Sequence, residues 1–95
     1  MWKIASVDRT ISKKLEKYKA NKQLTDNYSK FIEDLTNADD PRKLGEPKQG
    51  RFRKCFGKHM TKSHSLIYYV DFEKRTVYLI DLDDHKNLYG RDNRA

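Results

Sequence analysis

The sequence lacks the cysteines that an internal disulfide needs, because Cys55 is its only one. Nothing therefore indicates an oxidising compartment, and a cytoplasmic location is the expectation. The first ten residues contain no apolar stretch long enough for a signal peptide, and no run elsewhere approaches the length of a membrane span. Internal repeats and low-complexity segments are also absent.

Metal ligands are scarce as well. His59, His64 and His85 do not form a zinc-binding spacing with Cys55, so we expect no metal and no other cofactor. Cys55 is expected to pack inward, because a catalytic cysteine would need a clear histidine partner.

Apolar residues make up only 36% of the 95 residues. That fraction predicts one domain, residues 1–95, with one modest core.

Positive charge is concentrated in one part of the chain. The formal net charge is +7. Residues 42–62, here called the basic segment, contain eight lysines and arginines and one acid, Glu46, so this segment alone carries +7. Such a concentration is typical of phosphate binding, or of a surface that receives an acidic protein partner.

The first forty residues have helical periodicity. Apolar residues recur at spacings of three and four and predict a first amphipathic helix: Ile4, Val7, Ile11, Leu15 and Tyr18. Ser6 is a candidate N-cap, and residues 2–4 are alternatively a very short strand. Thr25 with Asp26 is expected to cap a second, antiparallel helix, whose inward residues are Tyr28, Phe31, Ile32 and Leu35. Pro41 ends it.

The periodicity changes to that of strands after Gly50. Alternating or β-branched and aromatic residues predict three antiparallel strands within residues 51–56, 65–72 and 75–82, with a hairpin turn at Glu73-Lys74. The fold class is therefore α+β, with two N-terminal antiparallel helices packed on a small antiparallel sheet. The opposite sheet face is left for Arg51, Arg53, His64 and the tail, which would make a cradle for single-stranded RNA.

The tail, residues 83–95, is the most chemically loaded stretch. It brings together one imidazole, one phenol and several cations: His85, Lys86, Tyr89, Arg91 and Arg94. An imidazole moves protons near neutral pH, a phenol donates or stacks on a base, and cations hold phosphate. These are the residue types that metal-independent RNA cleavage requires, since a 2′-hydroxyl must lose a proton and the leaving 5′-oxygen must gain one.

Several segments carry a family resemblance. The helix pair, Leu44-Gly45, RFRK at 51–54, HSLIYYVD at 64–71 and VYLIDL at 77–82 resemble the RelE/ParE superfamily of bacterial toxins. The tail DHKNLYGRDN at 84–93 resembles the YafO-like branch of that superfamily. The resemblance implies a RelE-like fold with a shortened or absent first strand. It also implies an mRNA interferase that cuts message on the ribosome and is held inactive by a cognate antitoxin.

The resemblance also implies roles for individual residues. Arg53 and Lys54 would stabilise the charge on the scissile phosphate, His85 would be the general acid or base, and Tyr89 would stack on or donate to the nucleotide. Other cations and one imidazole are candidates for RNA binding: Arg51, Lys58, Lys62, His64, Lys86 and Arg91. His64 has a second interpretation as a packing residue at a strand edge.

One position departs from the family pattern. Where the family strand usually reads Arg-Leu-Val-Tyr, this chain reads Ser65-Leu66-Ile67-Tyr68, so a transition-state arginine is missing. Lys62, His64 or Arg91 are candidates to supply its charge. The departure favours an alternative: a non-enzymatic ParE-like toxin that inhibits gyrase, or an RNA-binding module. An acidic antitoxin, mRNA and the ribosome are the expected partners, with no membrane.

Overall fold

The computed structural model describes residues 1–90. Five strands form one mixed sheet in the order β1-β5-β4-β3-β2, in which β1 is parallel to β5 and the other neighbours are antiparallel. The elements follow the chain as β1 (Lys3–Ser6), α1 (Thr10–Lys17), α2 (Lys22–Asn37), the 3-10 helix η1 (Pro41–Leu44), β2 (Glu46–Pro47), the 3-10 helix η2 (Gly50–Phe52), β3 (Phe56–His59), β4 (His64–Asp71), β5 (Thr76–Asp84) and α3 (His85–Tyr89).

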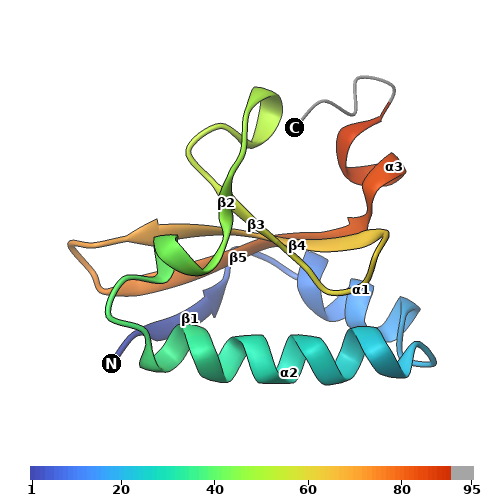
Figure 1. The fold of residues 1–95 in the computed structure, drawn as a ribbon, viewed down its shortest axis with the longest axis horizontal. Helices are drawn as coiled ribbons and strands as arrows, with labels where there is room; N and C mark the ends of the chain where they lie inside the picture. The colour runs from blue at the N-terminus through green and yellow to red at the C-terminus, as the bar shows by residue number, and fades with distance from the viewer. Residues whose placement is uncertain (91–95) are drawn as a thin grey trace.

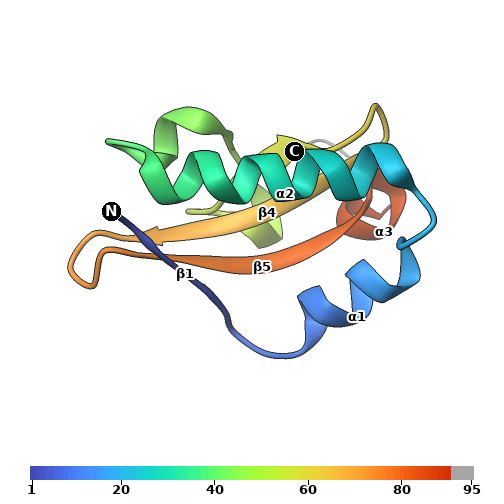
Figure 2. The ribbon, with the colours of Figure 1, turned by 90° about the horizontal axis from the view of Figure 1, so that it is seen from below.

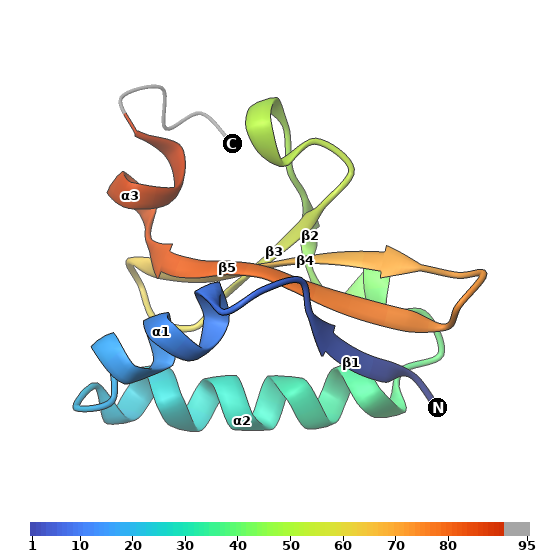
Figure 3. The same cartoon turned by 180° about the vertical axis from the view of Figure 1, so that it is seen from behind.

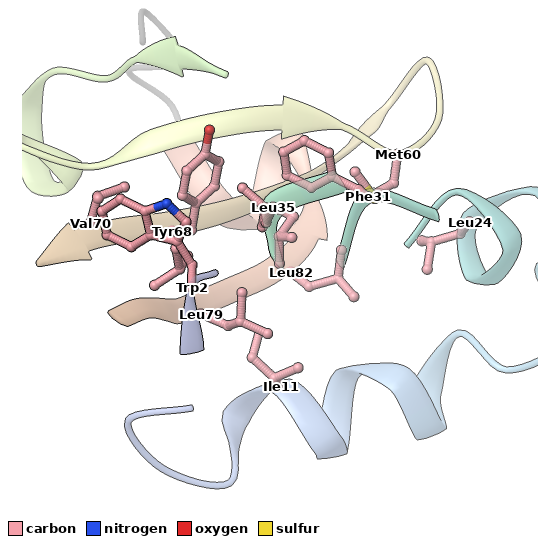
Figure 4. Close-up of a cluster of buried hydrophobic side chains, with 12 residues drawn as sticks. Trp2, Ile11, Leu24, Phe31, Leu35, Met60, Tyr68, Val70, Leu79 and Leu82 are labelled. Carbon is pink, nitrogen blue, oxygen red and sulfur yellow. The ribbon is translucent and has the colours of Figure 1, made fainter. Parts of the chain in front are cut away.

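Helices lie on both sides of the sheet. The hairpin of α1 and α2 covers one face, here called the helix face, whereas α3 rises from the opposite face, here called the site face (Figures 1 and 3). The main core fills the space between the sheet and the helix hairpin, around Leu35, Tyr68 and Leu82 (Figure 4). A smaller cluster of Phe52, Ile67 and Leu88 lies on the site face. The predicted α+β class is thus confirmed, but the sheet is mixed and not purely antiparallel, because β1 adds to one edge parallel to β5 while β2 adds to the other edge.

The N-terminus differs from the prediction. Residues 3–6 form a strand instead of the start of a helix, because the backbone from Lys3 to Ser6 pairs with residues 76–79 of β5. Ser6 is therefore the last residue of β1 and not an N-cap, and α1 begins only at Thr10. The first strand is therefore present, with four residues, so of the expectation of a shortened or absent strand only the absence is wrong, and the alternative of a strand at residues 2–4 is close to the observed one.

Helix α2 begins earlier than predicted. The Asn21 side chain accepts a hydrogen bond from the Leu24 backbone N–H at 3.1 Å, so Asn21 is the cap, and Thr25 and Asp26 lie inside the helix. Phe31 and Leu35 are buried, as predicted. Tyr28 and Ile32 also pack on the core but are only partly buried.

The strand predicted for residues 51–54 is wrong. Residues four apart in a strand point to the same face, but Phe52 packs on the site face and Phe56 packs with the main core on the helix face. The chain must therefore turn between them. It does so through η2 and through Lys54, whose φ is 75°, and β3 begins only at Phe56.

The predicted meander of β3, β4 and β5 and its hairpin turn are present, with one irregularity. The register between β4 and β5 shifts between Ile67 and Tyr68, which face Asp81 and Leu79, so Ile80 is an extra residue. Leu79 and Leu82 consequently pack in the same main core, whereas Ile80 packs on the site face. A strict alternation along the strand predicted for residues 75–82 would place Leu82 on the same face as Ile80, so the bulge was not predicted.

Gly45 lies where a side chain has no room. A Cβ added there would be 2.5 Å from the Tyr68 hydroxyl oxygen and 2.9 Å from the Gly57 carbonyl oxygen. The Tyr68 hydroxyl itself is held in place, because it donates to the Pro41 carbonyl at 2.8 Å. We expect Gly45→Ala to lower the free energy of unfolding by about 1–3 kcal/mol, as overpacking does. Urea denaturation measures this loss.

Tyr68→Phe provides the control for that prediction. Removing the hydroxyl costs one hydrogen bond but frees part of the space that the alanine methyl needs. Gly45→Ala should therefore cost less in the Tyr68→Phe background than in the natural chain, with a coupling of about 0.5 kcal/mol or more. Simple addition of the two single-variant losses would contradict the proposed overlap.

Candidate functional site

His85 begins the short helix α3 on the site face. The Asp84 carboxylate caps this helix by accepting from the Asn87 backbone N–H at 2.8 Å. The His85 backbone N–H donates to the Ser63 carbonyl at 2.9 Å, which joins the helix to the turn before β4. Leu88 is fully buried beneath the helix. These contacts hold a helix of five residues that would not be stable alone.

The His85 ring meets a second imidazole. Its Nε2 lies 2.9 Å from the Oγ of Ser65, a buried serine of β4. Its ring centroid is 4.9 Å from that of His59, which approaches edge-on at the end of β3. The pairing of β3 with β4 sets His59 opposite Ser65, so both side chains reach the same face. Two groups able to transfer protons therefore lie in contact.

Lys48 supplies a cation beside these rings. Its ammonium lies 5.3 Å from the centroid of the Tyr89 ring, and Tyr89 is in turn 5.8 Å from His85. The lysine stem crosses Gly57 so closely that a Cβ on that glycine would overlap the Lys48 Cε. Because Gly57 has no side chain, the Lys48 side chain can pass over it and reach the site.

The electrostatics of the site favour an uncharged His85. Burial lowers the pKa of the ring, and the nearby His59, Lys48 and His64 lower it further, while Asp84 offsets part of the effect. A histidine with a lowered pKa is mostly unprotonated at neutral pH, so it is ready to accept a proton.

Tyr89 is placed differently from the prediction. Its ring packs against Phe52 at 6.2 Å between centroids, within the small cluster on the site face. Its hydroxyl is buried and has no hydrogen-bond partner within residues 1–90. The ring therefore supports His85 and Lys48, and the hydroxyl is not exposed to a nucleotide in this arrangement.

The two predicted catalytic cations do not reach His85. Arg53 and Lys54 are exposed in the turn between η2 and β3, and in the described part of the chain neither side chain makes a hydrogen bond or ion pair. Arg51 is exposed nearby, with its guanidinium 4.7 Å from the Phe52 ring centroid. Within residues 1–90, none of these three side chains hydrogen-bonds to His85 or forms an ion pair at the site.

The remaining RNA-binding candidates are scattered. Lys58 reaches toward the helix face, with its ammonium 5.8 Å from the Phe31 ring. His64 packs edge-on against Tyr18 at 4.8 Å, and its Nδ1 is 2.7 Å from the Thr61 Oγ1, which agrees with the packing interpretation. Lys62 and Lys86 are exposed. Arg91 lies outside the described residues.

A hollow of about 300 Å³ adjoins His59, between the end of η1 and β3. Its lining is mostly polar and basic: Lys43, Leu44, Gly45, Glu46, Gly57, Lys58 and His59.

Cys55 is half-buried on the site face, and burial raises the pKa of its thiol. No group of three or more potential metal ligands gathers in residues 1–90. None of the helices in that range is long and apolar enough to cross a membrane.

The fold has close counterparts among solved structures. YafQ from Escherichia coli superposes with a TM-score of 0.75 at 14% identity, covering 95% of this chain and 100% of YafQ. A metal-bound toxin from Helicobacter pylori gives 0.74 at 20% identity, covering 94% and 100%. A chain of the YoeB–YefM complex, a toxin–antitoxin pair from Staphylococcus aureus, gives 0.67 at 11% identity, covering 87% and 95%.

Sequence comparison is less informative. No protein-family model matches this chain, and no curated protein matches it. The resemblance of the tail to the YafO-like branch stays a prediction, and residues 91–95 of that tail lie outside the described residues. In its fold, however, the chain matches YafQ and the Helicobacter pylori toxin along nearly its whole length, which agrees with the RelE-like fold that the resemblance implies.

Proposed function

We propose that this protein is the toxin of a type II toxin–antitoxin pair and that it is an endoribonuclease that cuts mRNA on the ribosome. The observation that carries the proposal is the contact between His59 and His85 on the site face, with Lys48 beside them. The fold shared with known toxins supports the same proposal.

The proposed reaction needs no metal. His85, kept uncharged, removes the proton of the 2′-hydroxyl, whose oxygen then attacks the adjacent phosphorus. His59 donates a proton to the departing 5′-oxygen, so that the P–O bond breaks and a 2′,3′-cyclic phosphate forms. Lys48 stabilises the extra negative charge of the phosphorane. Lys48 thereby takes the role that the sequence assigned to Arg53 and Lys54.

The basic segment supplies the binding surface in this proposal. Its exposed cations hold the flanking phosphates, among them Arg51, Arg53 and Lys54, which lie close in the sequence to Phe52 of the small cluster. A small domain positions a flexible RNA poorly by itself, so the ribosome completes the site in the cytoplasm. An acidic antitoxin would occupy the same basic surface and keep the toxin inactive.

A second candidate function rests on Ser65. This residue stands where the family has a strand arginine, and it is 1% exposed and engaged with His85. If Lys48 does not replace the missing charge, the protein is a ParE-like gyrase inhibitor or an RNA-binding module without cleavage activity.

Expression in growing cells separates these functions. Primer extension on abundant messages should find discrete cuts within translated codons, and the same cuts should appear with purified protein and ribosomes in the presence of a chelator that binds transition metals and leaves the Mg²⁺ that ribosomes need. Intact messages together with a DNA damage response would instead identify a gyrase inhibitor. Cleavage that the chelator abolishes would contradict the metal-independent mechanism.

The acid side of the pH–rate profile is a further prediction. A general base acts only when unprotonated, and His85 has a pKa below the ordinary histidine value of about 6.5. We therefore expect kcat/KM to decline with an apparent pKa below about 6.5 as the pH falls. In Lys48→Met this decline should move to higher pH, because a cation that lowers the pKa is gone. Single-turnover cleavage at a series of pH values measures the apparent pKa in the natural chain and in Lys48→Met. The same apparent pKa in both proteins would contradict the placement of Lys48 beside the general base His85.

A further inference from the structure

Asp83 is a buried carboxylate that receives donors from two helices on opposite sides of the sheet. It is the next-to-last residue of β5 and is 4% exposed. From α1 and its C-cap, the Lys14 ammonium lies 2.6 Å from Oδ2, and the Tyr18 hydroxyl donates to Oδ1. From α3, the Asn87 amide donates to Oδ1 at 3.1 Å.

The rest of the environment completes this network. The backbone N–H of Asp84 donates to Asp83 Oδ1 at 2.8 Å, and the Lys17 ammonium is 3.6 Å away. Lys14 also pairs with Asp81 at 2.9 Å. Helix α1 runs alongside the end of β5 that leads into α3 (Figures 2 and 3). The network therefore spans the two sheet faces at the point where the chain enters the site.

These donors stabilise the negative charge of the Asp83 carboxylate. Burial alone would raise its pKa, but the hydrogen bonds from Lys14, Tyr18 and Asn87 outweigh burial and keep the pKa well below the usual range. Burial and the hydrogen bond to Asp83 together raise the pKa of Tyr18 to about 12. A buried carboxylate with this many donors is costly to leave unpaired, so the donors and the carboxylate constrain one another's positions.

We propose that Asp83 is a positioning residue that ties α3 to α1 and thereby holds the His85 ring in the site. Asp83 is two residues before His85 and touches Asn87, one turn into a helix of only five residues. Loss of this anchor leaves the helix with its Asp84 cap and the buried Leu88, and the His85 ring gains freedom to leave Ser65 and His59. The inference deepens the proposed function, because the positioning matters for cleavage only if His85 acts in the site.

Nuclear magnetic resonance titration of the His85 ring tests the proposal on the purified full chain. The groups facing that ring are His59 from β3, Lys48 from the segment after β2, His64 and Ser65 from β4, and Asp84 and Tyr89 from its own end of the chain. In Asp83→Asn, release of the ring from its buried position should raise the His85 pKa toward the ordinary value. A purely electrostatic effect would have the opposite sign, because removing a negative charge disfavours imidazolium.

Two further variants make the test decisive. Tyr18→Phe removes one hydroxyl from the network and should move the His85 pKa in the same direction by less. Lys19→Met is the matched control, since Lys19 is exposed and pairs only with Glu16 on α1 within the described residues, and it should leave the titration unchanged. If Asp83→Asn does not fold, Tyr18→Phe alone decides the outcome. An unchanged or lowered His85 pKa in a folded variant overturns the proposal.

Kinetics separate this inference from the proposed function. If the natural chain cleaves RNA, Asp83→Asn should lose about 10- to 100-fold in kcat with a smaller change in KM, as misplacement of a catalytic group does. If the natural chain cleaves no RNA under any condition, the proposed function fails, while the titration still decides whether Asp83 positions His85.

Discussion

Replacing His85 with alanine is expected to reduce RNA cleavage by about 10²- to 10⁴-fold, the usual cost of removing a positioned general acid or base. The His85 ring lies at the centre of the candidate site, because it contacts Ser65, His59 and Tyr89. Burial lowers the pKa of the ring, which in the proposed mechanism accepts the 2′-hydroxyl proton. Single-turnover cleavage of a ribosome-bound message measures the loss.

Binding to the cognate antitoxin is the control for His85→Ala. The side chain is only partly buried, and the main core lies on the other side of the sheet, so the variant should fold and should bind antitoxin as tightly as the natural chain. His59→Ala should also lose cleavage, because it removes the proposed proton donor. Full residual cleavage in a folded His85→Ala protein would refute the assignment.

Lys48→Met is expected to reduce kcat by about 10²- to 10³-fold, which is the typical effect of losing one group that stabilises charge in the transition state. Methionine keeps most of the apolar stem that crosses Gly57 and removes the ammonium beside Tyr89. Substrate binding should change less than kcat, since the other cations of the basic segment still hold the flanking phosphates. Steady-state kinetics at fixed ionic strength resolve the two parameters.

Two companion variants sharpen this prediction. Lys30→Met is the matched control, because it removes an exposed lysine from α2 on the helix face and should leave kcat unchanged. Gly57→Ala retains every cation but forces the Lys48 stem to move, and should therefore lower kcat with little effect on stability. Equal losses of kcat in Lys30→Met and Lys48→Met would show that Lys48 contributes only to the overall positive charge of the protein and has no specific role in the site.

The helices and the three-stranded meander followed from sequence because their signals are local. Apolar spacing of three and four residues indicates a helix wherever it occurs, and β-branched and aromatic runs joined by a short turn indicate hairpins. Strand β1 has no such signal. Its partner, β5, lies about seventy residues further along the chain, and only that parallel pairing makes residues 3–6 extended.

The site was only partly accessible from sequence. His85 and Tyr89 were recognisable because the tail concentrates reactive side chains in a few residues. Lys48 was one of eight cations in the basic segment, and nothing local distinguished it from Arg53 or Lys54. It enters the site because the chain turns at Lys54 and because Gly57 leaves its stem a path.

His59 and Asp83 make the same point. His59 reaches His85 through the register of β3 against β4, and Asp83 reaches Lys14 and Tyr18 because α1 packs along the end of β5. By itself, the amino-acid sequence determined the composition of the core, the excess of positive charge in residues 42–62 and the chemistry of the tail. Only the tertiary structure decided which imidazole and which lysine lie beside His85 and which carboxylate contacts both α1 and α3, because contacts between residues distant in the chain depend on strand register and on turns that leave no periodic pattern.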